Sequence, residues 1–276
     1  MSVPELSQAI RIGRVVLAAV ASVLASACDA SGIAWTDPMT LSSAAADSRL
    51  VVDGKGRARL IADTSVSVKP TGDPRLCSGS VGAVRQDDGT LVATWWSVRD
   101  DSSAVLLAAV SPDAGPSWRP PLRVDTADVS VAGCDRPPPS ISASAGFVHI
   151  AYSMRDRQGA GVFYAHSMDR GGSYEPAATI VYGDRLTPAA IAADKGSVAV
   201  AYEDPSGATP QVGLAISRDW GHIFGYRGRG STGVGSATLP RVAVTSREIA
   251  VSWMQGSSAA DANGRATRIV RVGRLQ

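Results

Sequence analysis

An eight-residue pattern, S-x-D-x-G-x-S-aromatic, constrains this chain most strongly, because the pattern recurs. It occurs in full at Ser111–Trp118 and again at Ser167–Tyr174. A third, altered copy lies at Ser217–Phe224, where Ile223 replaces the second Ser. The Asp can accept backbone N–H groups within a tight turn, and the Gly permits a positive φ there. Repetition at this length indicates an architecture of repeated units.

Short apolar runs of alternating polarity surround each of these turns. An aromatic residue ends such a run upstream of each copy, at Trp96, Tyr152 and Tyr202, and a similar run ends at Trp253. Another apolar run precedes each of these, in most cases with a Gly-containing turn between the two. Each repeat therefore has the order strand, turn, strand, loop, strand, Asp turn, strand. This is the order of a four-stranded antiparallel blade. The sequence therefore predicts an all-β chain folded as a β-propeller.

Five blades fit the spacing of the runs, with six as the alternative. We expect blade one at about 48–80, blades two, three and four from about 81, 138 and 187, and blade five at about 239–276 with 33–43. The last assignment follows from Trp35–Leu41, which resembles the segments that follow the Asp turns. The N-terminal stretch would then supply the fourth strand of blade five. A ring closed in this way has no open sheet edge.

The octet resembles the Asp box of bacterial sialidase-like propellers, which are also called BNR-repeat proteins, and the repeat frame covers nearly all of 31–276. The resemblance implies that Asp113, Asp169 and Asp219 are structural and lie opposite the active site. For an active sialidase it also implies an R-I-P motif, three Arg that bind a carboxylate, an acid/base Asp, and a Tyr nucleophile activated by a Glu. No R-I-P occurs in this sequence.

Residues 1–27 have the pattern of an export signal: a basic start, an apolar run and an A-x-A cleavage site at Ala25–Ala27. The apolar run is too short to span a membrane. Cys28 follows directly, so the site also resembles a bacterial lipobox, although its Leu stands one place early. We expect a lipoprotein anchored through Cys28 in the periplasm or cell envelope, with simple secretion as the alternative. The expected organisation is a signal at 1–27, a linker and closing strand at 28–47, and the propeller at 48–276.

Cysteine usage fits an oxidising compartment. Besides Cys28 the chain has Cys77 and Cys134, which lie in loops that enter the innermost strands of neighbouring blades. We expect these two to form a disulfide, with two separate buried thiols as the alternative. Two Cys without nearby His do not form a zinc site, so we expect no metal and no cofactor. A net charge of +2 gives no basis for nucleic-acid binding.

One face of the predicted propeller collects arginines and carboxylates around the axis, because the entering loops and the second-to-third loops meet there. Arg presents a planar fork that binds a carboxylate through paired hydrogen bonds. We therefore expect a binding module with an axial funnel for an acidic sugar or another carboxylate ligand, or for a protein partner. The alternative is that neighbouring Asp residues neutralise the arginines. The expected ligand-binding residues are Arg75, Arg99, Arg136, Arg155 and Arg185.

Catalysis by an exo-acting glycoside hydrolase of the sialidase type is the alternative function. Glu203 is the candidate partner for a nucleophile, Tyr182 is the candidate nucleophile, and Asp156 could complete a carboxyl pair with Glu203. Nothing in the spacing selects these residues over others, and the missing R-I-P favours the binding module. We expect the three His to be packed or exposed rather than catalytic. The chain contains no G-x-S-x-G or H-E-x-x-H pattern.

Overall fold

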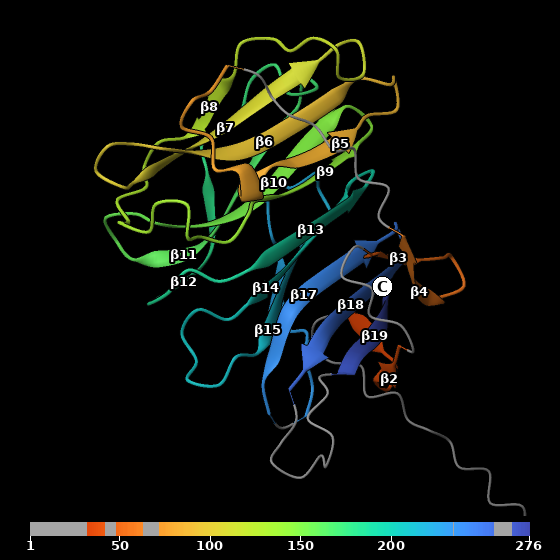
Figure 1. Cartoon of the computed structure of the whole chain (residues 1–276). Helices are drawn as coiled ribbons and strands as arrows, with labels where there is room; N and C mark the ends of the chain where they lie inside the picture. Colours follow the sequence, from red (N-terminus) through yellow and green to blue (C-terminus); the bar gives the residue numbers. More distant parts are fainter. Residues whose placement is uncertain (1–31, 42–47, 63–71, 234, 257–266) are drawn as a thin grey trace, which may run out of the picture.

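The computed structural model describes residues 32–41, 48–62, 72–233, 235–256 and 267–276 (Figure 1). In these ranges the chain forms β-strands and one short 3-10 helix, Ser78–Ser80. The strands form five antiparallel sheets, three of them with four strands each. The predicted all-β fold with four-stranded antiparallel blades is confirmed. The expected signal segment and Cys28 lie outside the described residues.

Each sheet corresponds to one predicted blade. Blade one contains β3 (Ser48–Val52) and β4 (Ala58–Ala62), and blade two contains β5 (Gly82–Arg85), β6 (Leu91–Val98), β7 (Ala104–Ser111) and β8 (Leu122–Asp125). Blade three contains β9 (Ser140–Ser144), β10 (Phe147–Arg155), β11 (Ala160–Ser167) and β12 (Ala178–Gly183). Blade four contains β13 (Ala189–Asp194), β14 (Ser197–Glu203), β15 (Val212–Ser217) and β16 (Tyr226–Arg229). Blade five contains β17 (Ala237–Val244), β18 (Glu248–Gln255) and β19 (Thr267–Leu275), with β1 (Ile33–Trp35) and β2 (Met39–Thr40).

The N-terminal segment closes blade five, as predicted from its resemblance to the post-turn segments. Strand β1 pairs with the end of β19, placing Ile33 opposite Leu275, and β2 pairs with its start, placing Thr40 opposite Ile269. The boundary expected for blade one is wrong, because residues near 76 belong to blade two. Leu76 forms a β-bridge with Ser97, so the stretch before β5 lies beside β6.

The blades pack in sequence around the inner strands. Contacts run from β5 to β9, to β13, to β17 and to β3, which are the first strands of successive blades. The repeat aromatics Trp96, Tyr152, Tyr202 and Trp253 are buried between blades, which is the core role that their spacing predicts. Trp96 of blade two meets Tyr152 of blade three edge to face, with ring centroids 5.8 Å apart. Such aromatic contacts stabilise the joint between two sheets.

The Asp turns contain the hydrogen bonds that the octet predicts. In the turn of blade two, the Asp113 carboxylate accepts the Ser117 N–H at 2.9 Å, and the buried Ser111 hydroxyl accepts the Gly115 N–H at 2.7 Å. The turn of blade three repeats both bonds. In the altered turn of blade four the Ile223 N–H still bonds the Asp219 carboxylate at 2.9 Å. The Ser-to-Ile difference therefore removes a hydroxyl and leaves the turn intact.

Candidate functional site

The blades have two ends. The turns between first and second strands and the Asp turns lie at one end, which we call the Asp-turn end. The entering loops and the second-to-third loops lie at the other, which we call the loop end. The predicted ligand-binding arginines lie in segments of the loop end.

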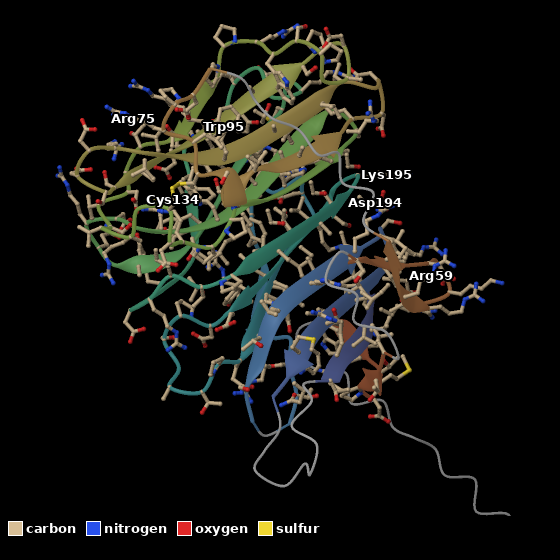
Figure 2. The ribbon with its side chains drawn as sticks, viewed as in Figure 1. Arg59, Arg75, Trp95, Cys134, Asp194 and Lys195 are labelled. Atoms are coloured by element: carbon tan, nitrogen blue, oxygen red, sulfur yellow. A yellow bond between two sulfur atoms is a disulfide. The ribbon has the colours of Figure 1, made fainter. Side chains whose placement is uncertain are left out.

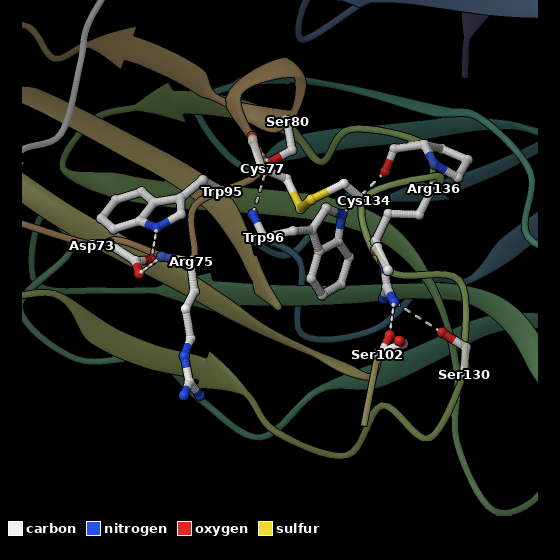
Figure 3. The surroundings of a disulfide bond; sticks show 12 residues. Asp73, Arg75, Cys77, Ser80, Trp95, Trp96, Ser102, Ser130, Cys134 and Arg136 are labelled. Carbon is white, nitrogen blue, oxygen red and sulfur yellow. Dashed lines mark hydrogen bonds between the residues drawn. A yellow bond between two sulfur atoms is a disulfide. The ribbon is translucent and has the colours of Figure 1, made fainter. Parts of the chain in front are cut away.

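Arg75 is exposed and paired with a carboxylate. Its guanidinium lies 3.0 Å from Asp100, and both side chains are largely in solvent. Asp73 accepts the Arg75 backbone N–H and the Trp95 indole N–H, each at 2.9 Å, which fixes the loop on β6 (Figure 3). Figure 2 shows where Arg75 and Trp95 lie in the whole molecule. An exposed pair of this kind contributes little to stability. Arg75 is therefore available to solvent molecules at the rim.

Three further arginines bind backbone carbonyls of neighbouring loops. Arg99 donates to the Thr126 carbonyl at 2.7 Å, Arg155 donates to the Asp184 carbonyl at 2.8 Å, and Arg185 donates to the Gly207 carbonyl at 2.5 Å. Each bond spans two connections of the loop end. These guanidiniums therefore brace the loops and have only part of their donor capacity left for a ligand.

Arg136 is enclosed and its donors are used within the protein, which contradicts its expected role at the ligand. Its guanidinium forms an ion pair with Asp128 at 2.9 Å, and the two side chains are 0% and 1% exposed. It also bonds the Ser130 hydroxyl at 3.0 Å and lies over the Trp96 ring, 5.1 Å from the centroid (Figure 3). Its Nε donates to the Gly133 carbonyl at 2.7 Å, so every nitrogen of the guanidinium has a partner within the protein and Arg136 is a structural residue.

Beside Arg136 the structure contains the disulfide expected from the cysteine positions. Cys77 and Cys134 are bonded, with their Cα atoms 5.4 Å apart and 57 residues between them in sequence (Figure 3). Cys77 precedes blade two and Cys134 precedes blade three. The bond therefore joins the segments that lead into two adjacent blades.

Two of the three candidate catalytic residues lie together. The Tyr182 hydroxyl lies 2.8 Å from the Asp156 carboxylate and 2.7 Å from the Gln158 side-chain oxygen. Tyr182 is on β12, the outer strand of blade three, so this pair lies away from the inner strands. Glu203 is not among the hydrogen-bond partners of the Tyr182 hydroxyl in the described part of the chain. The Tyr–Glu pair implied by the sialidase resemblance is therefore not formed.

Glu203 belongs to a different group, centred on β17. It ends β14 of blade four and is half-buried. Burial raises the pKa of its carboxyl, while Arg185 and the backbone N–H of Leu239 oppose that rise. Leu239 adopts a positive φ of 51° and lies where the β17–β18 register shifts. A non-glycine residue in this region is conformationally strained, and such residues concentrate at functional sites.

The Leu239 carbonyl accepts a hydrogen bond from a buried arginine, Arg268, which is not among the arginines expected to bind a ligand. Arg268, on β19, is 4% exposed. Its Nη1 donates to the Leu239 carbonyl at 3.3 Å and to the Ser252 hydroxyl at 3.2 Å, and its Nε has no hydrogen-bond partner. Both bonds are long for N–H···O. Within the described ranges Arg268 forms no ion pair with a carboxylate.

A second arginine, Arg241 on β17, lies near Arg268. Burial, together with the positive charge of Arg241, lowers the pKa of Arg268 to about 10. Arg241 itself donates to the Ser48 hydroxyl of blade one. We call Glu203, Leu239, Arg241 and Arg268 the β17 cluster. It lies at the loop end, because β14 ends there and β17 and β19 begin there.

The alternating pattern of β19 in the sequence marks Arg268 as an unusual residue. Residues 268, 270 and 272 alternate along β19 and share one face of the sheet. Val270 and Val272 are buried, so this face points into the protein. A charged residue in register with two buried valines is a departure from the strand pattern. Such departures are expected at functional sites.

We expect replacement of Arg268 by Met to stabilise the unliganded protein, by about 1 kcal/mol, because the change removes a buried cation with an unpaired donor. The free energy of unfolding, measured with denaturant, tests this. A loss of several kcal/mol would show that Arg268 holds the fold together and would contradict this expectation.

The three histidines lie together between blades three and four, where His149 and His166 are buried and His222 is exposed. His149 is fully buried on β10, and its Nδ1 lies 2.7 Å from the Tyr164 hydroxyl. The rings of His149 and His166 stack with centroids 6.3 Å apart, and His222 of the altered Asp turn meets His166 at 5.1 Å.

In the described part of the chain no group of three or more His, Cys, Asp or Glu could hold a metal ion. In the same residues, no helix has the length and apolar character needed to cross a bilayer.

Comparisons with known proteins give structural neighbours only. No family model matches the sequence, and no curated protein matches it. The structural neighbours include the Hadza microbial sialidase Hz136, at 16% identity and a TM-score of 0.47, covering 68% of this chain and 45% of that one. A Trypanosoma rangeli sialidase has 11% sequence identity and a TM-score of 0.47, and the match covers 80% of this chain and 39% of that one. The Bacillus subtilis arabinanase Arb43A has 11% identity and a TM-score of 0.40, and the match covers 84% of this chain and 95% of that one. This chain thus matches about half of the length of the first sialidase. Sialidases and other glycosidases are among the neighbours, and the functional inference rests on this chain's own residues.

Proposed function

We propose that this chain is an exported binding module whose loop end takes an acidic ligand at the β17 cluster. The observation that carries the proposal is Arg268: a buried guanidinium with an unpartnered Nε and no carboxylate partner among the described residues. Buried charges are normally paired. A ligand carboxylate would supply the missing acceptor, and an Arg fork can bind it through two N–H groups.

The rest of the cluster supports an anion of modest size. Arg241 adds a second positive charge near Arg268. Glu203, whose pKa is raised by burial, is more readily protonated than an exposed Glu and would then donate a hydrogen bond to a ligand oxygen. The positive charge of Arg185 acts on the Glu203 carboxyl, so Arg185 is part of the proposed site. Arg75, Arg99 and Arg155 would form its rim, and Arg136 is excluded. The ligand class is an acidic sugar or a carboxylate-bearing peptide end.

A thermal-shift screen with free acidic sugars tests this proposal. The parent protein should melt at a higher temperature with a binding sugar, because a ligand that binds only the folded state stabilises it. Arg268→Met should lose that response. Arg57→Met, which removes an exposed arginine of the β3–β4 turn at the Asp-turn end, is the matched control and should keep the response. An undiminished response in Arg268→Met would refute the proposed site.

The second candidate function is glycoside hydrolysis, and the raised pKa of Glu203 is the observation that favours it. Glycosidases keep one carboxyl protonated near neutral pH by burial, so that it can act as the general acid. The expected second carboxyl, Asp156, is engaged with Tyr182 instead. A fluorogenic sialoside and neutral glycosides should be assayed with the parent and with Glu203→Gln. Turnover that is lost in Glu203→Gln would favour the enzyme, and no turnover with any substrate would favour the binding module.

We also propose that the chain is anchored through a lipid on Cys28 in the periplasm or cell envelope. The support is the A-S-A-C site after the apolar run. One acyl chain alone binds membranes marginally, so a stable anchor needs several. Mass spectrometry of the mature N-terminus decides this. A terminus other than Cys28, or an unmodified Cys28, would contradict the proposal.

A further inference from the structure

A groove of about 400 Å³ lies between blades four and five at the Asp-turn end. Its apolar lining includes Ile33, Ile216 and Leu275, which are buried. Ile223, the residue that replaces Ser in the altered Asp turn, also lines it and is 69% exposed. An apolar hollow with an exposed isoleucine at its edge marks a site that can take an apolar group.

The repeat shows how the blades are joined beside this groove. In blades three and four the aromatic residue of the Asp turn packs against the preceding blade. Tyr174 contacts the buried Val92 and Val110 of blade two, and Phe224 meets Tyr164 of blade three with ring centroids 4.9 Å apart. In blade five the strands that flank this position, β19 and β1, are not consecutive in sequence. No Asp turn joins them, but Trp35 of β1 takes the position of the turn aromatic: the Thr36 N–H bonds the Val272 carbonyl at 2.8 Å, as the Glu175 N–H bonds the His166 carbonyl in blade three, and Trp35 packs on the core shared by blades four and five.

The chain enters the described structure at this groove. Gly32 is part of the lining, and its carbonyl accepts the Gln276 N–H at 3.0 Å. Cys28 precedes Gly32 by four residues in the sequence. An extended chain spans at most about 3.5 Å per residue, so Cys28 lies within roughly 14 Å of Gly32. A group attached to Cys28 is therefore within reach of the groove.

We propose that an acyl chain attached to Cys28 occupies this groove. The inference rests on the anchor proposed above and is independent of the β17 cluster. It also accounts for Ile223, because an apolar residue at the rim favours a hydrocarbon chain where Ser would favour water. With further chains in the bilayer, the Asp-turn end would face the membrane and the loop end would face away from it.

The first experiment uses the mature chain from Cys28 onward without lipid, and a fluorescent fatty acid as the probe. The parent should bind the probe in the groove, and palmitate should displace it. Ile223→Glu should weaken binding at least tenfold, since it places a charge at the apolar rim. Met168→Glu changes an exposed apolar residue of the blade-three Asp turn, outside the groove lining, and should leave binding unchanged. Equal melting temperatures would show that both variants are folded.

The second experiment identifies the occupant. With Cys77 and Cys134 in a disulfide, Cys28 is the remaining thiol and can be alkylated with a hexadecyl maleimide. The alkylated protein should stay monomeric and should no longer bind the probe, because its own chain fills the groove. Probe binding that survives alkylation, or a parent that never binds the probe, would overturn the proposal. Probe binding by the parent combined with a native Cys28 that carries no lipid would also overturn it, because the occupant would then be a free lipid. Arg268→Met should bind the probe like the parent, which separates this test from that of the proposed function.

Discussion

Replacing Arg136 by Met is expected to lower the free energy of unfolding by roughly 3–5 kcal/mol, because it leaves the buried Asp128 carboxylate without its counter-ion. The pair is 2.9 Å apart and inaccessible to solvent, so water cannot compensate the lost charge. Asp128 also accepts the Ala104 N–H at 2.8 Å and the Arg155 N–H at 3.2 Å. The ion pair therefore ties the end of blade two to the end of a blade-three strand.

Denaturant unfolding at neutral pH measures this effect, with two controls. Arg99→Met removes a partly exposed arginine from the same region and should change stability by less than Arg136→Met. Asp128→Asn combined with Arg136→Met should recover part of the loss, since neutralising the carboxylate removes the uncompensated charge. A loss below about 1 kcal/mol for Arg136→Met would contradict the structural role given to this residue.

Lowering the pH from 7 to 5 is expected to destabilise the protein by about 2 kcal/mol through His149 alone. Burial, with His166 and His222 nearby, lowers the pKa of His149 from 6.5 to about 3. Between those values the unfolded chain binds a proton that the folded protein does not. The contribution of neutral His149 is therefore complete above pH 6.5 and is lost progressively as the pH falls.

The titratable groups that face His149 either lower the stability in the same direction as the pH falls or change protonation outside the range from pH 7 to 5. The pKa of His166 is lowered by burial and by His222, while Glu175 raises it, and Tyr164 stays neutral in this range. Asp219 and other Asp-turn carboxylates have lowered pKa values and lose their protons well below pH 5. Unfolding free energies from pH 7 to 5 should therefore fall in the parent and fall less in His149→Phe, which keeps an aromatic ring between the blades. Equal slopes in the two proteins would contradict this account.

The fold could be predicted from the sequence because its signals are local. Alternating runs define strands, and the Asp and Gly of each octet define a turn whose bonds the structure contains. The residues before the turn glycines, Ala114, Arg170 and Trp220, also adopt positive φ, which the octet does not reveal because their side chains differ. The end of blade one was misplaced because a single β-bridge, Leu76 to Ser97, assigns that stretch to its neighbour.

The candidate site was predicted less well, because its chemistry depends on burial. Arg136 and Arg185 occupy equivalent places in the repeat, yet Arg136 is enclosed by Asp128 and Ser130 while Arg185 reaches backbone carbonyls. Arg268 matters because the backbone at Leu239 turns a carbonyl toward it and no carboxylate follows. The alternation of residues 268, 270 and 272 can be read from the sequence, but the Leu239 carbonyl turned by the register shift in β17 cannot.

Calorimetric titration of an acidic sugar against its methyl ester tests most directly whether the β17 cluster recognises a carboxylate. The ester lacks the negative charge and carries a methyl group on one of the two oxygens that an Arg fork would bind. For a sugar that binds, the acid should bind the parent at least tenfold more tightly than the ester, and Arg268→Met should bind both with the same low affinity. Equal affinity of the parent for acid and ester, or an undiminished preference for the acid in Arg268→Met, would contradict the account.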